Sequence, residues 1–236
     1  MLTKALKAIA LLVVVLAVGF AGSIWWKLQP RENPQPLPAD LVSLFDEAGL
    51  RLLADADARA DYDLLRDNYQ SQALRSYCGV ASSVTVLSAL GREIDQDSFF
   101  TSQASEIRPR RKVMLGGMSL PELAGLLRAH GAAVTLQHAS LSDVEQFRET
   151  VVRNLSKEGD FLLVNYQRQV LGQNKVGHIS PVAAYDRETD TVLIMDTASY
   201  SYPPTWVPVE GLFEAMATLD RSSGKSRGYA EVSLAD

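Results

Sequence analysis

The sequence predicts an α+β fold in which helices pack on a largely antiparallel sheet. In the first half of the globular part, apolar residues recur at helical spacing, whereas the second half contains short segments rich in β-branched and aromatic residues. Residues 186–190, DRETD, have the composition of a hairpin connection between two of these segments. Helices that are followed by strands joined in hairpins are typical of this fold class.

The composition narrows the possible functions. The 236 residues are 47% hydrophobic and 22% charged, the balance of an ordinary globular protein. A net charge of −5, without an extended block of lysine and arginine, argues against binding to nucleic acid. One cysteine excludes an internal disulfide and a CxxC site. The three histidines show no ligand-pair spacing with it, so we expect no metal site.

Residues 1–28 form a separate N-terminal segment. Two lysines precede an uncharged apolar run from Ala8 to Trp26, whose nineteen residues are enough to cross a bilayer. Trp25 and Trp26 would then lie in the interfacial layer where aromatic residues gather. We therefore expect a membrane anchor, with a cleaved signal peptide as the alternative, because residues 19–21 are Gly-Phe-Ala and offer a possible cleavage site.

The amino end of this segment is basic, which favours a topology with that end in the cytoplasm and the rest in the periplasm or outside the cell. Residues 29–39 contain four prolines and predict an extended tether. Residues 40–236 would then form the folded domain.

Helices are expected over 40–56 and 78–90, where apolar residues follow helical spacing. Ser119 and Glu122 form a capping box that begins a third helix, and Gly131 can end that helix.

Ser142 and Glu145 repeat the capping pattern for a helix that ends near Gly159. The strands lie between and after these helices, in segments bounded by turn-forming residues. They are expected at 132–137, 161–168, 178–185, 191–196 and 227–234.

The single cysteine, Cys78, has two interpretations. A lone cysteine is often a small buried apolar residue. Here, however, Gly79 and a helical pattern follow it, which places the thiol in the first turn of a helix, where the positive end of the helix dipole stabilises a thiolate. Gly79 would also leave room for a substrate backbone. A nucleophilic cysteine further needs a base, and that base needs an orienting group.

Three histidines are available as the base. His130 lies at an expected helix end, where we expect it to cap the helix, and His138 ends a strand without an acidic neighbour. His178 begins a strand, and the next strand ends at Asp196. If these strands form a hairpin, His178 and Asp196 meet at one end of the sheet, where a carboxylate can orient an imidazole. The residues by themselves leave a Cys78–His178–Asp196 triad and a structural cysteine about equally open.

Four segments together resemble the catalytic domain of phytochelatin synthases, in particular the short bacterial phytochelatin synthase-like proteins. They are SQALRSYCGVASSVTVLSAL at 71–90, GHISPVAAYDRETDTVLIMDTA at 177–198, YPPTWVPVEGLFEAM at 202–216 and GKSRGYAEVS at 224–233. The resemblance implies a papain-like cysteine protease fold from about residue 40 onward. It also implies cleavage of the Cys–Gly bond of glutathione, with the γ-Glu-Cys group passed from an acyl-enzyme to water or to a second glutathione.

The resemblance assigns catalytic roles to four residues. It implies Cys78 as the nucleophile, His178 as the general base and acid, and Asp196 as the orienting carboxylate. Gln72, six residues before the cysteine, matches a glutamine that helps to form an oxyanion hole.

The resemblance also implies a site for the γ-glutamyl group. Asp220 would bind its ammonium and Arg227 its α-carboxylate, with Asn165 and Gly177 nearby. The alternative for Asp220 and Arg227 is an ordinary exposed loop pair. No tightly bound cofactor is expected, and cadmium or zinc would enter as a metal–glutathione thiolate substrate. The expected location is the inner membrane of a bacterium, with the domain facing the periplasm, or export from the cell. A homodimer is a further expectation.

The chain departs from its relatives at two positions. Many relatives read D-x-x-R-Y-K-Y-P-P, whereas this chain has Ser199 and Ser201 in place of the two cations. We therefore expect weaker capture of a second, anionic glutathione and more hydrolysis than transfer.

Two other functions agree with parts of the sequence. A papain-like peptidase of the bacteriocin-processing type would share the Gln–Cys–His–Asp order, and it would need an open groove for peptide side chains. A non-enzymatic thiol module for binding metal would have one thiol and three scattered histidines, which make a poor site for a soft metal.

Overall fold

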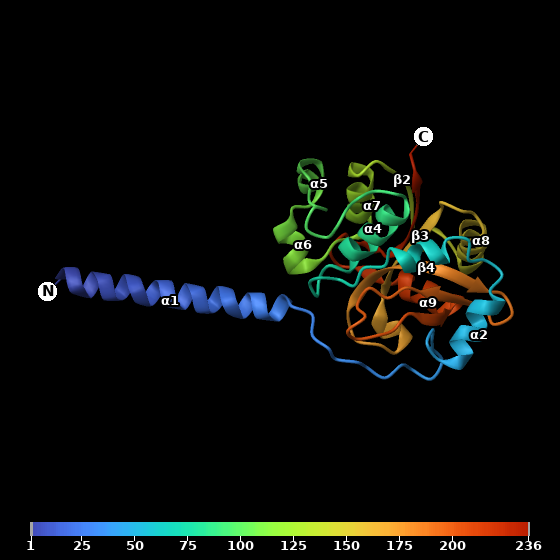
Figure 1. Ribbon diagram of the computed structural model, residues 1–236, viewed down its shortest axis with the longest axis horizontal. Coiled ribbons are helices and arrows are strands. Elements are labelled where there is room, and N and C mark those ends of the chain that lie inside the picture. Colours follow the sequence, from blue (N-terminus) through green and yellow to red (C-terminus); the bar gives the residue numbers. More distant parts are fainter. Residues whose placement is uncertain (1, 236) are drawn as a thin grey trace.

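The computed structural model describes residues 2–235; within the first helix, side chains are described at 6–7, 11–20 and from 22 onward. A seven-stranded antiparallel sheet with the order β1-β6-β5-β4-β3-β9-β2 forms the centre of the domain (Figure 1). The prediction of an α+β fold with a largely antiparallel sheet is therefore confirmed.

The helices and strands have the following bounds. The strands are β1 (Val42–Ser43), β2 (Ala132–His138), β3 (Phe161–Gln167), β4 (Gly177–Asp186), β5 (Thr191–Ile194), β6 (Thr205–Pro208) and β9 (Gly228–Leu234), with a separate ribbon of β7 (Leu219–Asp220) and β8 (Lys225–Ser226). The helices are α1 (Leu2–Leu28), α2 (Glu47–Asp55), α3 (Tyr62–Asp67), α4 (Cys78–Ala89), α5 (Ser102–Ile107), α6 (Arg110–Gly116), α7 (Leu120–Ala129), α8 (Val144–Leu155) and α9 (Val209–Ala217), with 3-10 turns η1 (Ala139–Leu141) and η2 (Arg168–Leu171).

Helices cover both faces of the sheet. Successive residues of a strand point to opposite faces, so one strand packs against both layers of helices. Leu163 of β3 belongs to the apolar cluster that contains α4 and α7. Its neighbours Leu162 and Val164 belong to the cluster that contains α8 and α9. The central strands are consequently buried on both sides, and β3 is apolar along most of its length.

Two connections bring the first and second halves of the chain together. Helix α4 packs against β4, and the hydroxyl of Ser82 donates a 2.9 Å hydrogen bond to the carbonyl of Ile179. Strand β4 pairs with β5 as the expected hairpin, and the N–H of Met195 donates to the carbonyl of Pro181 at 2.9 Å beyond the end of β5. This extra pairing brings Asp196 close to the beginning of β4.

Two predicted helices differ in their details. The helix expected over 40–56 begins only at Glu47, because residues 42–43 pair with β6 as strand β1 instead. The N-cap of α8 is Asp143, whose carboxylate accepts the N–H of Gln146 at 2.9 Å, rather than Ser142. The capping box at the start of α7 is confirmed.

The N-terminal segment is the helix α1, which projects away from the domain (Figure 1). The prolines after it prevent helix formation, yet this tether does not hang free. Its backbone is attached to the domain, since Asn33 donates to the carbonyl of Tyr200 at 2.8 Å and Gln35 donates to the carbonyl of Ser201 at 2.9 Å. At the end of α1, the carbonyl of Leu28 accepts the N–H of Arg75 at 2.9 Å.

Candidate active site

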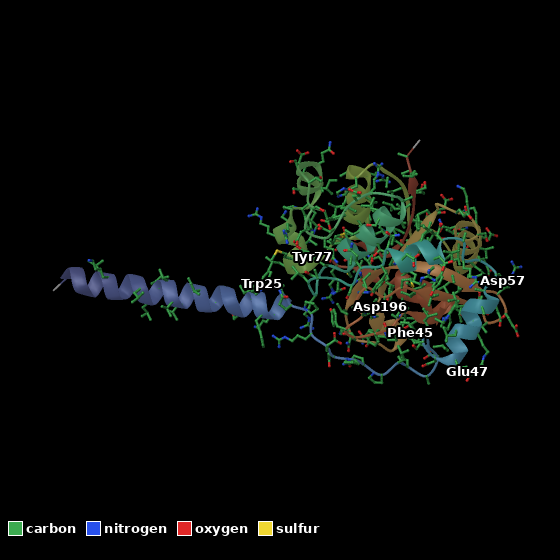
Figure 2. The ribbon with its side chains drawn as sticks, viewed as in Figure 1. Trp25, Phe45, Glu47, Asp57, Tyr77 and Asp196 are labelled. Carbon is green, nitrogen blue, oxygen red and sulfur yellow. The ribbon has the colours of Figure 1, made fainter. Side chains whose placement is uncertain are left out.

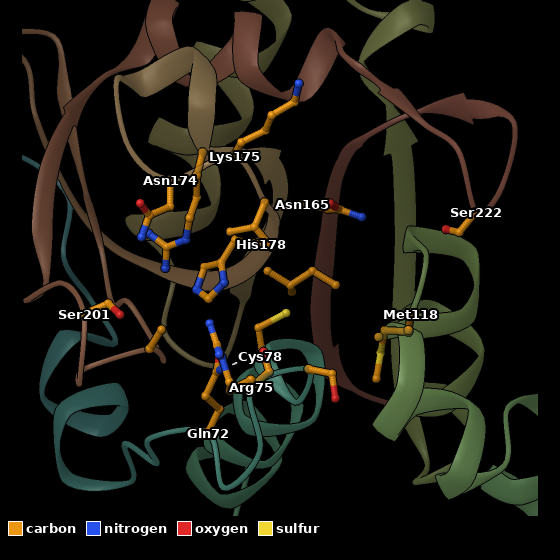
Figure 3. Close-up of a pocket in the computed structure, with 18 of the residues that line it drawn as sticks. Gln72, Arg75, Cys78, Met118, Asn165, Asn174, Lys175, His178, Ser201 and Ser222 are labelled. Carbon is orange, nitrogen blue, oxygen red and sulfur yellow. Dashed lines mark hydrogen bonds between the residues drawn. The ribbon is translucent and has the colours of Figure 1, made fainter. Parts of the chain in front are cut away.

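A cleft of about 730 Å³ opens where the N-terminus of α4 meets the beginning of β4. Cys78, His178 and Gln72 line it, and Figure 3 shows the side chains of His178 and Cys78 close to each other. The volume lies within the range of small-molecule sites, which is about 300–1,000 Å³.

Cys78 is the first residue of α4, and its thiol is partly buried. The helix has no side-chain cap, so its first N–H groups are available beside the thiol. The interpretation of Gly79 was wrong in one respect. A Cβ atom there would lie 2.7 Å from the sulfur of Met118, so the missing side chain makes room for Met118 rather than for a substrate.

His178 lies between the thiol and a buried carboxylate. Its Nε2 atom is 3.0 Å from Oδ1 of Asp196, which is an ion-pair distance, although the N–H is not aligned for a hydrogen bond. Tyr166 packs edge-on against the imidazole, with ring centroids 5.8 Å apart. Cys78, His178 and Asp196 are therefore brought together as predicted.

Arg168 is a component of the site that the sequence analysis missed. It lies in the turn η2, only 2% exposed, and its Nη2 atom is 2.7 Å and 2.6 Å from the two carboxylate oxygens of Asp196. Nη1 donates to Gln173 at 2.7 Å, and the guanidinium lies 4.8 Å from the ring centroid of Tyr202. Arg168 thus fixes the carboxylate of Asp196, which lies against the imidazole of His178.

The charges of these groups stabilise one another. Burial would raise the pKa of Asp196, but Arg168 and His178 hold it well below the usual range. Burial and the charge of Arg168 would lower the pKa of His178, yet Asp196 and the thiol raise it overall. Burial would likewise raise the pKa of Cys78, but the hydrogen bond and the charge of His178 lower it. The site therefore favours a thiolate–imidazolium pair.

Gln72 is buried beside this pair. Its amide nitrogen donates 2.9 Å hydrogen bonds to the carbonyl of Arg75 and to the hydroxyl of Tyr200. Its amide oxygen has no partner among the described residues. The contact with Tyr200 was not predicted from the sequence. Its hydroxyl is a neutral acceptor for the N–H of Gln72, and a charged acceptor could replace it.

The four residues predicted to bind substrate meet at one wall of the cleft. Nη1 of Arg227 donates to Oδ1 of Asn165 at 2.9 Å and lies 3.8 Å from a carboxylate oxygen of Asp220. The amide nitrogen of Asn165 is buried without a partner in the described part of the chain. A Cβ atom on Gly177 would lie 2.8 Å from the guanidinium of Arg227. Asp220 and Arg227 are mostly buried, which excludes the alternative of an exposed loop pair.

A family model described as phytochelatin synthase matches residues 33–229. The chain belongs to the phytochelatin synthase family. It is 37% identical over 171 residues to glutathione gamma-glutamylcysteinyltransferase 3 of Lotus japonicus, which covers 70% of this chain and 36% of that protein. It is 36% identical over 171 residues to glutathione gamma-glutamylcysteinyltransferase 1 of Arabidopsis thaliana, with 70% and 35% covered. The glutathione gamma-glutamylcysteinyltransferase of Schizosaccharomyces pombe is 24% identical over 223 residues, with 91% and 53% covered. The chain thus spans little more than a third of the length of these two plant relatives.

The two other histidines lie outside the cleft of this phytochelatin synthase family member. His130 is the C-cap residue of α7, as predicted, and its backbone N–H donates to the carbonyl of Leu127 at 3.0 Å. Nε2 of its ring is 2.8 Å from the carbonyl of Phe99. Nδ1 of His138 is 2.7 Å from the carbonyl of Ser226. Within residues 2–235, no group of three or more His, Cys, Asp or Glu side chains is arranged to hold a metal ion.

The two serines that depart from the family pattern have different surroundings. Ser199 lies 2.8 Å from the hydroxyl of Ser71 and lines a second cavity of about 400 Å³, whereas Ser201 lines both that cavity and the cleft. Cations reach the cleft from other positions. Arg75 and Lys175 line it and are exposed, and neither makes an ion pair with a described residue.

Proposed function

We propose that the protein is a cysteine-dependent glutathione γ-glutamylcysteinyltransferase with a papain-like fold. The observation that carries the proposal is the thiol of Cys78 at a helix N-terminus, beside an imidazole that Asp196 and Arg168 hold in place. A thiolate that is already ionised can attack a carbonyl without first losing a proton.

The reaction begins when the sulfur of Cys78 attacks the carbonyl carbon of the Cys–Gly bond. The imidazolium of His178 then gives its proton to the glycine nitrogen, the carbon–nitrogen bond breaks, and a γ-Glu-Cys thioester remains on the enzyme. Neutral His178 next takes a proton from water, or from the amino group of a second glutathione, as that nucleophile attacks the thioester. The Cys78 thiolate is released and the imidazolium forms again, so the cycle closes.

The γ-glutamyl group of glutathione carries one ammonium and one carboxylate. Asp220 would accept the ammonium, and the guanidinium of Arg227 would bind the carboxylate through paired hydrogen bonds. Asn165 already orients Arg227 and keeps a free buried N–H for the substrate. Gly177 leaves the space that Arg227 occupies. These contacts fix one end of the substrate while the scissile bond lies over Cys78.

Gln72 would stabilise the oxyanion of the tetrahedral intermediate together with the N–H of Cys78. One of its N–H groups stays on the carbonyl of Arg75, and the other exchanges the hydroxyl of Tyr200 for the oxyanion. The exchange is favourable because a hydrogen bond to a charged acceptor is roughly twice as strong as one between neutral groups.

We propose that water is the main acceptor. The cations that relatives carry at two positions are Ser199 and Ser201 here, and Ser199 is turned toward Ser71. The chromatographic ratio of γ-Glu-Cys to the dimeric phytochelatin, measured with and without cadmium, tests this. Cadmium or zinc would enter as the thiolate complex of the substrate. Predominant chain elongation would show that the two serines do not govern the choice of acceptor.

We also propose that α1 is a membrane anchor. It has the length and apolar composition to cross a bilayer, a test that a signal sequence also passes. Full-length protein should stay with membranes during carbonate extraction. A mature N-terminus at Gly22 would instead identify a cleaved signal peptide.

Purified protein incubated with glutathione, with products read by mass spectrometry, tests the reaction. We expect free glycine and γ-Glu-Cys, and Cys78→Ser should release neither while keeping the thermal unfolding curve of the parent. Retention of most activity in Cys78→Ser would remove the nucleophile from the proposal. Cleavage of larger peptides instead of glutathione would indicate a peptidase.

A further inference from the structure

The end of α1 is part of the mouth of the active-site cleft. The side chain of Leu28 lines the cleft, and its carbonyl accepts the N–H of Arg75, another residue that lines it. Only Lys27 separates Leu28 from Trp26, where the uncharged apolar run ends. A helix rises 1.5 Å per residue, so the mouth lies within about one turn of the end of that run.

The tether gives the domain little freedom to turn away from α1. It leaves the helix at Gln29 and is then bound along the loop at 200–201 through the N–H groups of Asn33 and Gln35. Arg31 adds a contact back to the helix, because its guanidinium lies 3.4 Å from the ring centroid of Trp26. An anchored α1 would therefore orient the domain as well as hold it.

Apolar side chains are exposed on this side of the domain. Leu115 at the end of α6 is 72% exposed and Val176 before β4 is 50% exposed, and both line the mouth. Figure 1 shows α6 on the side of the domain from which α1 projects, and Figure 2 shows Trp25 of α1 on that same side. Two exposed apolar residues are ordinary by themselves, so their meaning depends on the charges beside them.

Unpaired cations accompany these apolar residues, since Arg111 and Lys112 lie one turn before Leu115 in α6 and Lys175 directly precedes Val176. Both α6 residues, Arg111 and Lys112, are exposed and form a short basic cluster. Together with Arg75 and Lys175 at the mouth, they make no ion pair with any residue that the structure describes. The protein as a whole carries a net charge of −5, so this basic surface is a local feature.

We infer that the surface formed by Arg75, Arg111, Lys112, Leu115, Lys175 and Val176, here called the mouth surface, lies against the anionic headgroups of the membrane that α1 crosses. The inference rests on the proposed anchor. Lysine and arginine near the cytoplasmic leaflet bind anionic lipid at about 1 kcal/mol for each residue, and the same attraction acts wherever a leaflet exposes anionic headgroups. Leucine and valine can insert at the boundary between headgroups and acyl chains. The cleft would then open onto the layer of water at the membrane surface.

A fluorescent probe in a lipid nanodisc tests the position of the mouth surface. In full-length Cys78→Ser, a single new cysteine at Leu115→Cys is labelled with a polarity-sensitive dye, and lipids with nitroxide headgroups are added as quenchers. The control probe is Arg92→Cys, which lies beyond the far end of α4, a helix of twelve residues or about 18 Å. We expect strong quenching at 115 in anionic lipid, weaker quenching in neutral lipid, and none at 92.

Charge reversal supplies the matched comparison. The double variant Arg111→Glu with Lys112→Glu should lower the equilibrium constant for docking of the mouth surface on anionic lipid at least about thirtyfold, since two favourable contacts are lost. Arg92→Glu with Arg128→Glu, which reverses the same number of exposed charges elsewhere, should leave the quenching unchanged. Quenching at 115 that is no stronger than at 92, or that survives the α6 reversal unchanged, overturns the inference. Release of the chain from membranes by carbonate would refute both the anchor and the inference. If the chain stays with the membranes but the probe at 115 is not quenched, only the inference is refuted.

Discussion

The replacement His178→Gln tests the electrostatics of the candidate active site directly. In the parent protein, the imidazole lowers the pKa of the Cys78 thiol through a hydrogen bond and its positive charge. Glutamine has a similar reach but carries no charge. Burial, which raises the thiol pKa, would then act without its main opposing effect.

The expected loss of thiolate at Cys78 can be worked out from the ordinary pKa of a thiol. Lowering of the thiol pKa and raising of the imidazole pKa both shift the equilibrium from the neutral pair toward the thiolate–imidazolium pair. The thiolate is lost below the lowered thiol pKa, where Cys78 takes up a proton. Without the imidazole, the thiol pKa returns at least to its ordinary value of about 8.5, where only about 3% is ionised at pH 7. If the parent thiol is fully ionised at pH 7, its thiolate population should therefore fall about thirtyfold or more.

The assay is alkylation by iodoacetamide across a range of pH, and it is specific because Cys78 is the only cysteine. The pH of the half-maximal rate reports the thiol pKa even when the intrinsic nucleophilicity changes. We expect this midpoint to move to higher pH in His178→Gln and to stay in place in the control His130→Gln, whose ring contacts Phe99 outside the cleft. An unchanged midpoint in His178→Gln, with the fold intact by circular dichroism, would refute the proposed ion pair.

Three further predictions concern neighbouring residues. Gln72→Ala should lower kcat for glycine release about 10²–10³-fold without moving the alkylation midpoint, and a smaller loss would exclude Gln72 from the oxyanion hole. Arg168→Met should lower the free energy of unfolding by about 3–5 kcal/mol, because it leaves the buried carboxylate of Asp196 without its strongest partner; denaturant unfolding near the parent value would contradict this. Gly177→Ala should displace Arg227 and raise KM about tenfold, equivalent to ~1.4 kcal/mol, with little change in kcat; an unchanged KM would separate Arg227 from substrate binding.

The parts of the site that lie in one hairpin could be predicted from the sequence. His178 begins one strand and Asp196 follows the next, so hairpin pairing alone brings them to the same end of the sheet. The position of Cys78 at a helix start also followed from the apolar spacing after it. Local pattern was sufficient at these positions because each depends on a single helix or hairpin.

Arg168 could not be predicted in that way. It follows β3 in a 3-10 turn, and its partner Asp196 is 28 residues later in the chain. Nothing in the sequence near Arg168 indicates burial, because a buried arginine is recognised only once its carboxylate partner is placed. Short elements were missed for a related reason, since β6 and α6 have too few residues to show a period.

Cys78 and His178 are 100 positions apart in the chain, and the contact between α4 and β4 joins them. During synthesis, at about 5–20 residues per second, Cys78 therefore leaves the ribosome several seconds before the strand that activates it. Until β4 docks on α4, the thiol has neither the imidazole nor the N–H of Ile179 beside it, and it remains a weakly acidic, weakly reactive group. The lowered pKa of the thiol is therefore a property of the folded domain and is absent from the nascent chain.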